Sequence, residues 1–130
     1  MKKAYLAIGA VLLLVIGFVA VNAKNQPPSK YQTVSFSAVQ NNVSAGAKLY
    51  DVRTSQEYEA GHFANAENWS LQDMQAGKLP NVAKDTKLYV YCQSGNRSTQ
   101  ATKLLVDAGF TDVVDLGGLQ DVQASGGKLE

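Results

Sequence analysis

The sequence predicts an α/β domain with a central, mostly parallel five-stranded sheet and helices on both of its faces. The first observation is that short apolar segments alternate with helix-like segments along residues 31–130. The second is the segment 87–91, Lys-Leu-Tyr-Val-Tyr, whose unbroken aromatic and aliphatic composition is typical of a strand buried on both faces. The third is the helical spacing of apolar residues within 98–108.

The expected elements follow in chain order. The predicted strands cover residues 31–35, 48–52, 66–69, 87–91 and 113–116. The predicted helices cover residues 37–43, 56–60, 70–76 and 98–108. Thr54 or Ser55 is expected to cap the second helix. A glycine follows each helix, as is common at helix ends: Gly46, Gly61, Gly77 and Gly109.

The first thirty residues have a different character. Lys2 and Lys3 precede an unbroken apolar run over 4–21, which predicts an N-terminal apolar helix. A soluble core helix would show one polar face, and this run shows none. Small residues at Val21 and Ala23 suit signal-peptide cleavage, so residues 1–23 are either a signal peptide or a membrane anchor. We favour the anchor because the run is long.

The charges around this segment predict its orientation. The two N-terminal lysines are expected to stay in the cytoplasm, which places the domain outside it, either membrane-anchored or secreted. Residues 24–30, which include Pro27 and Pro28, have the composition of an extended linker. The domain itself is then 31–130. With a net charge of +1 and no basic stripe, nucleic-acid binding is not expected.

The chain has a single cysteine, Cys92. An exported protein with one cysteine has no internal disulfide. By composition alone, such a residue is more often a small buried hydrophobe than a nucleophile. The residues around Cys92 favour the nucleophile.

Cys92 stands at the predicted carboxyl end of the strand 87–91, where open α/β sheets bind ligands. The residues that separate it from Arg97 are Gln93, Ser94, Gly95 and Asn96. Gly95 and Asn96 tolerate the positive φ values that let a loop curl with its N–H groups pointing inward. The helix N-terminus and Arg97 add positive charge. Cys92 is therefore expected to be a thiolate at neutral pH.

The pattern Cys-x-x-Gly-x-Arg-Ser, ending at Ser98, resembles the active-site loop of the rhodanese family. The resemblance extends along nearly the whole domain, through the segments 49–53, 57–58, 61–63, 101–110 and 114–118 and through Asn68. The sequence departs from the family pattern at Asn65, where a Gly is usual, and at Val122, where a Trp is common. These departures leave the loop untouched.

This resemblance implies a sulfurtransferase that needs neither metal nor cofactor. Cys92 would take a sulfur atom from a small anionic donor such as thiosulfate, hold it as a persulfide among the N–H groups of 93–98, and pass it to a thiol or cyanide. Arg97, and with it Arg53, would attract the donor. For Arg53 we nevertheless favour a pair with Asp51 or Glu57.

Two further residues are interpreted as structural. Asp51 is expected to fix backbone turns rather than act as an acid. His62, the only histidine, is expected to be structural because a reaction that starts from a thiolate needs no base.

Three other functions were weighed. Related dual-specificity phosphatases have a longer loop and need a general acid, and no candidate acid lies near this loop. Rhodanese-like domains also serve as non-catalytic binding modules, commonly after loss of the cysteine. A thiol redox sensor would need an external partner, because the chain has no resolving cysteine. Neither of the last two is excluded by the sequence. The physiological donor and acceptor, cleavage of the leader and the oligomeric state cannot be predicted from it.

Overall fold

The computed structural model describes residues 31 and 34–130. Residues 31–130 form one compact unit. The predicted apolar helix over 4–21 and the linker lie outside the described residues. Within the described part of the chain, no helix combines the length and apolar character needed to cross a bilayer.

The described residues form an α/β fold around a parallel sheet, which confirms the predicted class. The four strands are β1 (Lys48–Asp51), β2 (Glu67–Asn68), β3 (Leu88–Tyr91) and β4 (Val113–Gly117). Their spatial order is β2-β1-β3-β4, and every neighbouring pair is parallel. The prediction of five strands was wrong for this part of the chain. Residues 31, 34 and 35 are not in a strand, and 32–33 are not described.

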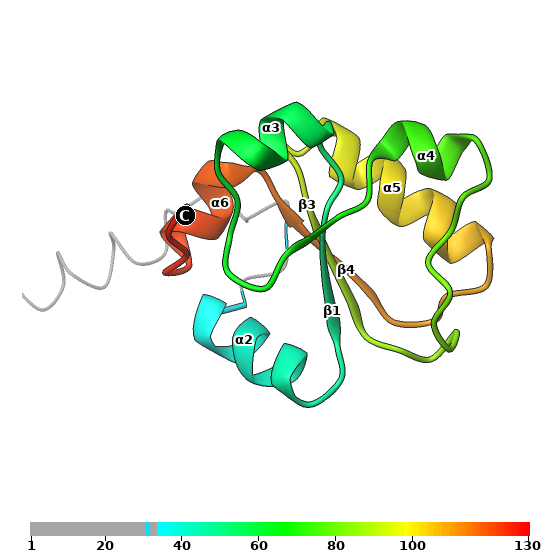
Figure 1. Cartoon of the computed structure of the whole chain (residues 1–130). Helices are drawn as coiled ribbons and strands as arrows, with labels where there is room; N and C mark the ends of the chain where they lie inside the picture. Colours follow the sequence, from blue (N-terminus) through cyan, green and yellow to red (C-terminus); the bar gives the residue numbers. More distant parts are fainter. Residues whose placement is uncertain (1–30, 32–33) are drawn as a thin grey trace, which may run out of the picture. The chain divides into compact units, whose positions relative to one another are not determined.

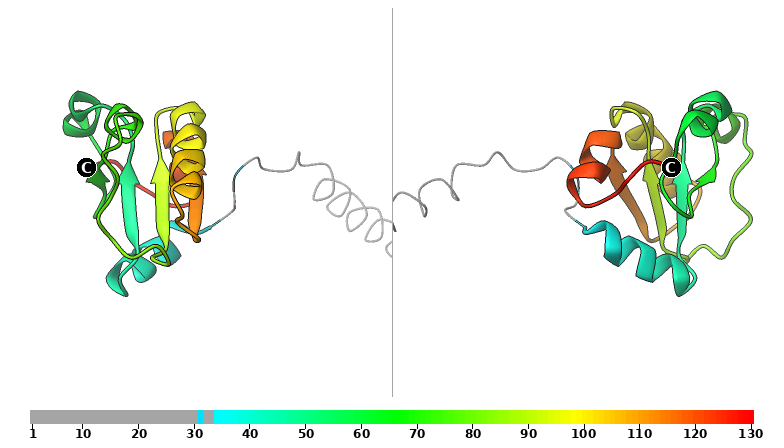
Figure 2. Two further views of the ribbon diagram at one scale, coloured as in Figure 1. Left: turned by 90° about the vertical axis from the view of Figure 1, so that its right-hand side faces the viewer. Right: turned by 60° about the vertical axis from the view of Figure 1, so that its left-hand side comes forward.

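Helices cover both faces of the sheet, as Figures 1 and 2 show. The helices are α2 (Phe36–Ser44), α3 (Ser55–Ala60), α4 (Leu71–Gln75), α5 (Asn96–Asp107) and α6 (Leu119–Ala124). On one face α2 and α6 bury Val39 and Val122 against the sheet. On the other face α4 and α5 bury Met74 and Leu105. The capping box of Thr54 and Glu57 begins α3, beyond the carboxyl end of β1.

The central strand β3 is buried on both faces, as its unbroken apolar sequence predicted. Its side chains alternate between the two faces, with Tyr89 and Tyr91 in one core cluster and Leu88 and Val90 in the other. All four are almost completely buried. A strand buried on both faces places the residue that follows it inside the protein, and that residue is Cys92.

Two boundaries differ from expectation in informative ways. The helix predicted at 98–108 begins at Asn96, because Gly95 alone takes the left-handed turn, with φ 99°, and Asn96 is already helical. The sequence analysis assigned no helix after Gly118, where α6 stands. Its first turn is held by the Asp121 carboxylate, which accepts a hydrogen bond from the Gly118 N–H at 2.8 Å.

Candidate active site

The loop that follows β3 carries Cys92 at the carboxyl end of the sheet, as predicted. The Cys92 side chain is fully buried, and its N–H donates to the carbonyl of Gly117 at 2.9 Å. Helix α5 begins four residues later, at Asn96. The sulfur therefore sits in a closed space between the ends of β3 and β4 and the start of α5.

The sulfur receives a backbone hydrogen bond from its own loop. The N–H of Gly95 donates to Cys92 Sγ at 2.9 Å. Gly95 occupies the N-cap position of α5 and has no side chain to place an oxygen there. The partial positive charge of the twelve-residue helix is thus left available to an anion held in the loop. The sequence predicted that several N–H groups of the loop point toward the sulfur. The structure shows a hydrogen bond to the sulfur from the N–H of Gly95.

Tyr31 and three glycines pack closely around the loop. A Cβ on Gly95 would collide with the Tyr31 hydroxyl, and a Cβ on Gly117 would lie 2.7 Å from Tyr31 Cδ2. A Cβ on Gly118 would lie 2.7 Å from the carbonyl oxygen of Gln93. The glycines therefore let an aromatic ring and the loop backbone approach closely. Tyr31 was predicted only as the start of a strand, because its contacts with these glycines lie more than sixty positions away along the chain.

Arg53 belongs to a buried network rather than to the surface. Its guanidinium bonds both carboxylate oxygens of Asp51, the shortest contact being 2.7 Å, and also donates to the Gly61 carbonyl. Burial alone would lower the pKa of Arg53, but the Asp51 carboxylate outweighs burial and raises this pKa. The pairing with Asp51 is confirmed. A weaker contact of 3.4 Å joins Arg53 Nη1 to Gln93 Oε1.

Asp51 also fixes the backbone, as expected. Its Oδ1 accepts the N–H of Arg53 at 3.0 Å. The Asn68 amide donates to the carbonyls of Asp51 and Arg53, at 3.1 and 3.0 Å. Asp51, Arg53 and Asn68 therefore hold the carboxyl end of β1 in place beside Cys92.

Arg97 makes a different pair, across to α3. Its two terminal nitrogens donate to the two carboxylate oxygens of Glu57 at 2.7 and 2.9 Å. This bidentate contact lowers the pKa of Glu57 to about 2 and raises the pKa of Arg97, to which Cys92 also contributes. Arg97 and Glu57 are each 31% exposed. The sequence had offered Glu57 as a partner for Arg53, so this pair was missed.

The remaining loop residues differ in solvent exposure. Gln93, Ser94 and Asn96 are exposed, whereas Ser98 is buried. The Ser98 hydroxyl donates to the carbonyl of Gly95 at 3.1 Å and so stiffens the turn below the sulfur. Substrate contacts by these side chains stay a prediction.

His62 contacts Tyr58. Its ring stacks on Tyr58 with centroids 3.8 Å apart, and its Nδ1 lies 2.9 Å from the Tyr58 carbonyl oxygen. Such contacts agree with a structural role. Among the described residues, no three carboxylate, imidazole or thiol groups gather to hold a metal ion.

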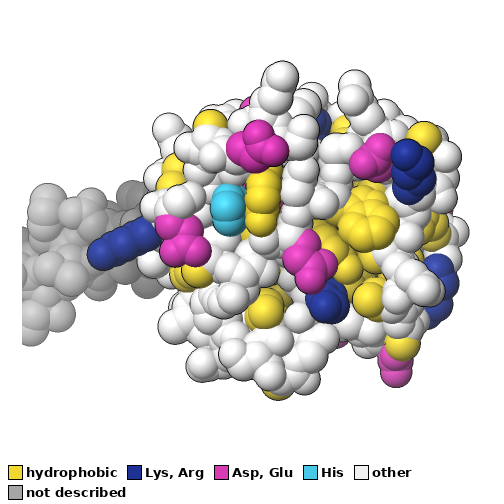
Figure 3. All heavy atoms as spheres, viewed as in Figure 1, with side chains coloured by type: hydrophobic (Ala, Val, Ile, Leu, Met, Phe, Trp, Pro, Cys, Tyr) yellow, Lys and Arg dark blue, Asp and Glu magenta, His cyan; other side chains and the backbone are white. Residues whose placement is uncertain are grey.

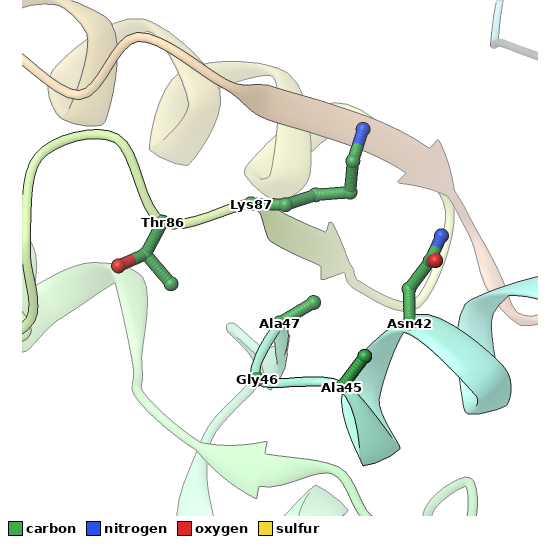
Figure 4. A pocket seen from close by; sticks show the side chains of 6 residues that line it. All are labelled: Asn42, Ala45, Gly46, Ala47, Thr86 and Lys87. Carbon is green, nitrogen blue, oxygen red and sulfur yellow. The ribbon is translucent and has the colours of Figure 1, made fainter.

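One hollow away from this loop has polar groups that are already paired. A hollow at the amino ends of β1 and β3, shown in Figure 4, includes Asn42 and Lys87 in its lining. Their polar groups are already used, because Asn42 donates to the Tyr89 hydroxyl and Lys87 pairs with Asp112. On the face shown in Figure 3, acidic and basic side chains are interspersed rather than gathered by sign.

The family model for the rhodanese-like domain matches residues 35–125. The chain belongs to this family. It is 34% identical over 83 residues to the thiosulfate sulfurtransferase PspE of Escherichia coli, covering 62% of this chain and 78% of that protein. The human single-domain sulfurtransferase TSTD1 superposes with a TM-score of 0.59 at 25% identity, covering 72% of this chain and 96% of that one.

Another relative is a much longer protein. The adenylyltransferase and sulfurtransferase UBA4 of Saccharomyces cerevisiae is 42% identical over 78 residues. The match covers 52% of this chain but 18% of UBA4, so this chain spans under a fifth of that protein's length. Rhodanese-family membership, with sulfurtransferases among the relatives, supports sulfur transfer in general.

Proposed function

We propose that this chain is a sulfurtransferase in which Cys92 carries a transferable sulfur atom as a persulfide. One observation carries the proposal: Cys92 Sγ is enclosed by a loop whose Gly95 N–H donates directly to it. A donor pointed at the sulfur stabilises negative charge there. The uncapped start of α5 acts in the same direction.

The proposed reaction has two steps. In the first, the Cys92 thiolate attacks the outer sulfur of thiosulfate or a similar donor. The sulfur–sulfur bond of the donor breaks, and its electron pair leaves with sulfite. The product is the anion Cys92–S–S⁻, whose charge the loop stabilises. In the second step a thiol or cyanide takes the outer sulfur and returns Cys92 to the thiolate.

The Arg97–Glu57 pair shapes the approach of the donor. Glu57 offsets part of the charge of Arg97, so the entrance to the site is not strongly cationic. An anionic donor can be bound by exchange with Glu57, because both side chains are partly exposed. Arg53 has no such freedom, and in this proposal it shapes the loop through Gln93.

The test is Cys92→Ser. The side chains have nearly the same size, so folding is expected to be preserved, but an alcohol is far too weakly acidic to form the anion. Thiosulfate:cyanide turnover should fall to background, and mass spectrometry of the wild-type domain after thiosulfate treatment should show one added sulfur on Cys92. A domain that forms no adduct and turns over equally well as Cys92→Ser would refute the proposal, leaving a binding module as the better reading.

The location of the domain is a separate proposal. On the basis of residues 1–30 alone, we propose that the domain lies outside the cytoplasm, either anchored by the apolar segment or released from it.

A further inference from the structure

A pocket of about 230 Å³ lies directly beside the catalytic loop. Its lining consists of Val52, Thr54, Ser70, Leu71, Gln72 and Arg97. Val52 donates its N–H to the carbonyl of Tyr91 at 3.0 Å, so it stands next to the strand end from which Cys92 follows. Arg97 ends the loop that encloses the sulfur. Two sides of the pocket are therefore parts of the site itself.

The lining has the character of a site for a small organic molecule. Val52 and Leu71 are buried apolar side chains and belong to the same core cluster as Cys92. Ser70 Oγ accepts the N–H of Asp73, which leaves its O–H free to donate. No carboxylate lines the pocket. The volume is below the roughly 300–1,000 Å³ of pockets that take drug-sized ligands. A short apolar body with one anionic end matches this lining.

The Arg97–Glu57 pair sets how that anion is bound. Glu57 takes one N–H from each terminal nitrogen of Arg97, so the remaining guanidinium donors can face the pocket. One negative charge fits beside a cation that is already half neutralised.

We propose that this pocket is the acceptor site and holds a small thiol that carries a carboxylate; this rests on the proposed function. The carboxylate binds the free donors of Arg97 and the Ser70 hydroxyl, and the carbon chain lies on Val52 and Leu71. The thiol proton of the acceptor passes to the outer sulfur of the Cys92–S–S⁻ anion, and the acceptor thiolate then attacks that sulfur. The old S–S bond breaks, its electron pair returns to Cys92 Sγ, and the acceptor leaves as R–S–S–H.

The experiment introduces a glutamate at either of two glutamine positions on the same helix. Gln72 and Gln75 are both exposed residues of α4, but Gln72 lines this pocket and Gln75 lines a different hollow, beside Lys103. Gln72→Glu and Gln75→Glu therefore add the same charge to the same element. Each variant is loaded with thiosulfate and discharged with mercaptoacetate, which is anionic, or with cysteamine, which is cationic. The readout is the ratio of the two kcat/KM values, in which any change in persulfide formation cancels.

Gln72→Glu should lower the ratio for mercaptoacetate over cysteamine by about 25-fold, because a unit charge at contact distance in water changes the binding of each ion by about fivefold and in opposite directions. Gln75→Glu should leave the ratio within about twofold of wild type, since its charge is more distant and screened. Equal ratios in the two variants would overturn the pocket assignment. Absence of any persulfide on Cys92 would instead overturn the proposed function, and mass spectrometry separates that result from the first.

Discussion

Two arginine–carboxylate pairs contact the loop that carries Cys92, and they differ in exposure. The side chains of Arg53 and Asp51 are 4% and 0% exposed, whereas those of Arg97 and Glu57 are each 31% exposed. Both pairs join a guanidinium to a carboxylate through several hydrogen bonds. The chemistry is the same, so the surroundings decide what each pair does.

Burial makes the pair of Arg53 and Asp51 a structural part of the fold. A buried charge cannot exchange its partner for water, so Arg53 and Asp51 stay together as long as the fold does. The second pair can open, because water compensates both groups when they separate. The difference indicates that Arg53 holds the loop and that Arg97 is the cation able to meet a substrate.

The largest expected effect comes from breaking the buried pair. Arg53→Ala should lower the free energy of unfolding by about 3–5 kcal/mol, because it leaves the Asp51 carboxylate buried without its partner. Urea unfolding measures this loss. The matched control is Lys103→Ala, which removes the exposed pair with Asp107 on α5 and should leave the free energy of unfolding almost unchanged. A loss for Arg53→Ala as small as that of the control would remove the distinction between the pairs.

An intermediate effect is expected at Arg97, and on activity rather than on stability. Arg97→Ala should reduce thiosulfate turnover by about tenfold, below the 10²–10³ typical of a directly placed donor, because backbone N–H groups still stabilise the sulfur. Its free energy of unfolding should change by less than about 1 kcal/mol. If Arg97→Ala destabilised the fold as much as Arg53→Ala does, Arg97 would be structural after all.

The smallest effect concerns Glu57 and depends on pH. The pKa of this carboxyl is about 2 in the folded chain, against 4.5 without a partner, so its stabilising contribution is complete above pH 4.5 and is lost as pH falls toward 2. Wild type should exceed Glu57→Gln in stability by less than about 1 kcal/mol at pH 7, and the difference should vanish near pH 2. Urea titrations at pH 7, 4.5 and 2.5 test this. A difference that grows on acidification would contradict the sign.

The sequence predicted the parts of the site that depend on local pattern. The unbroken apolar segment 87–91 placed Cys92 at a strand end, and Gly95 marked the turn before the helix. A two-residue separation also put Asp51 within reach of Arg53. These features follow from periodicity and backbone preference over a few residues.

What the sequence could not supply depended on distant contacts. Glu57 lies forty positions from Arg97, and the sequence had offered it only as a partner for Arg53. Helix α6 has six residues, too few for a clear periodic signal, and is stabilised by its packing through Val122. The fifth strand was expected from a weak segment whose residues 31, 34 and 35 are not in a strand.

The Tyr31 ring behind Gly95 and Gly117 bears on where the working unit begins. The segment shared with the family model runs from 35 to 125, and Tyr31 lies before it. At the other end, Glu130 exchanges two backbone hydrogen bonds with His62, again outside that segment. Trimming the chain to the shared segment would open a void behind the sulfur and release the turn after α3. The segment that the family model matches is therefore shorter than the piece of chain that holds the loop, which includes Tyr31 and Glu130.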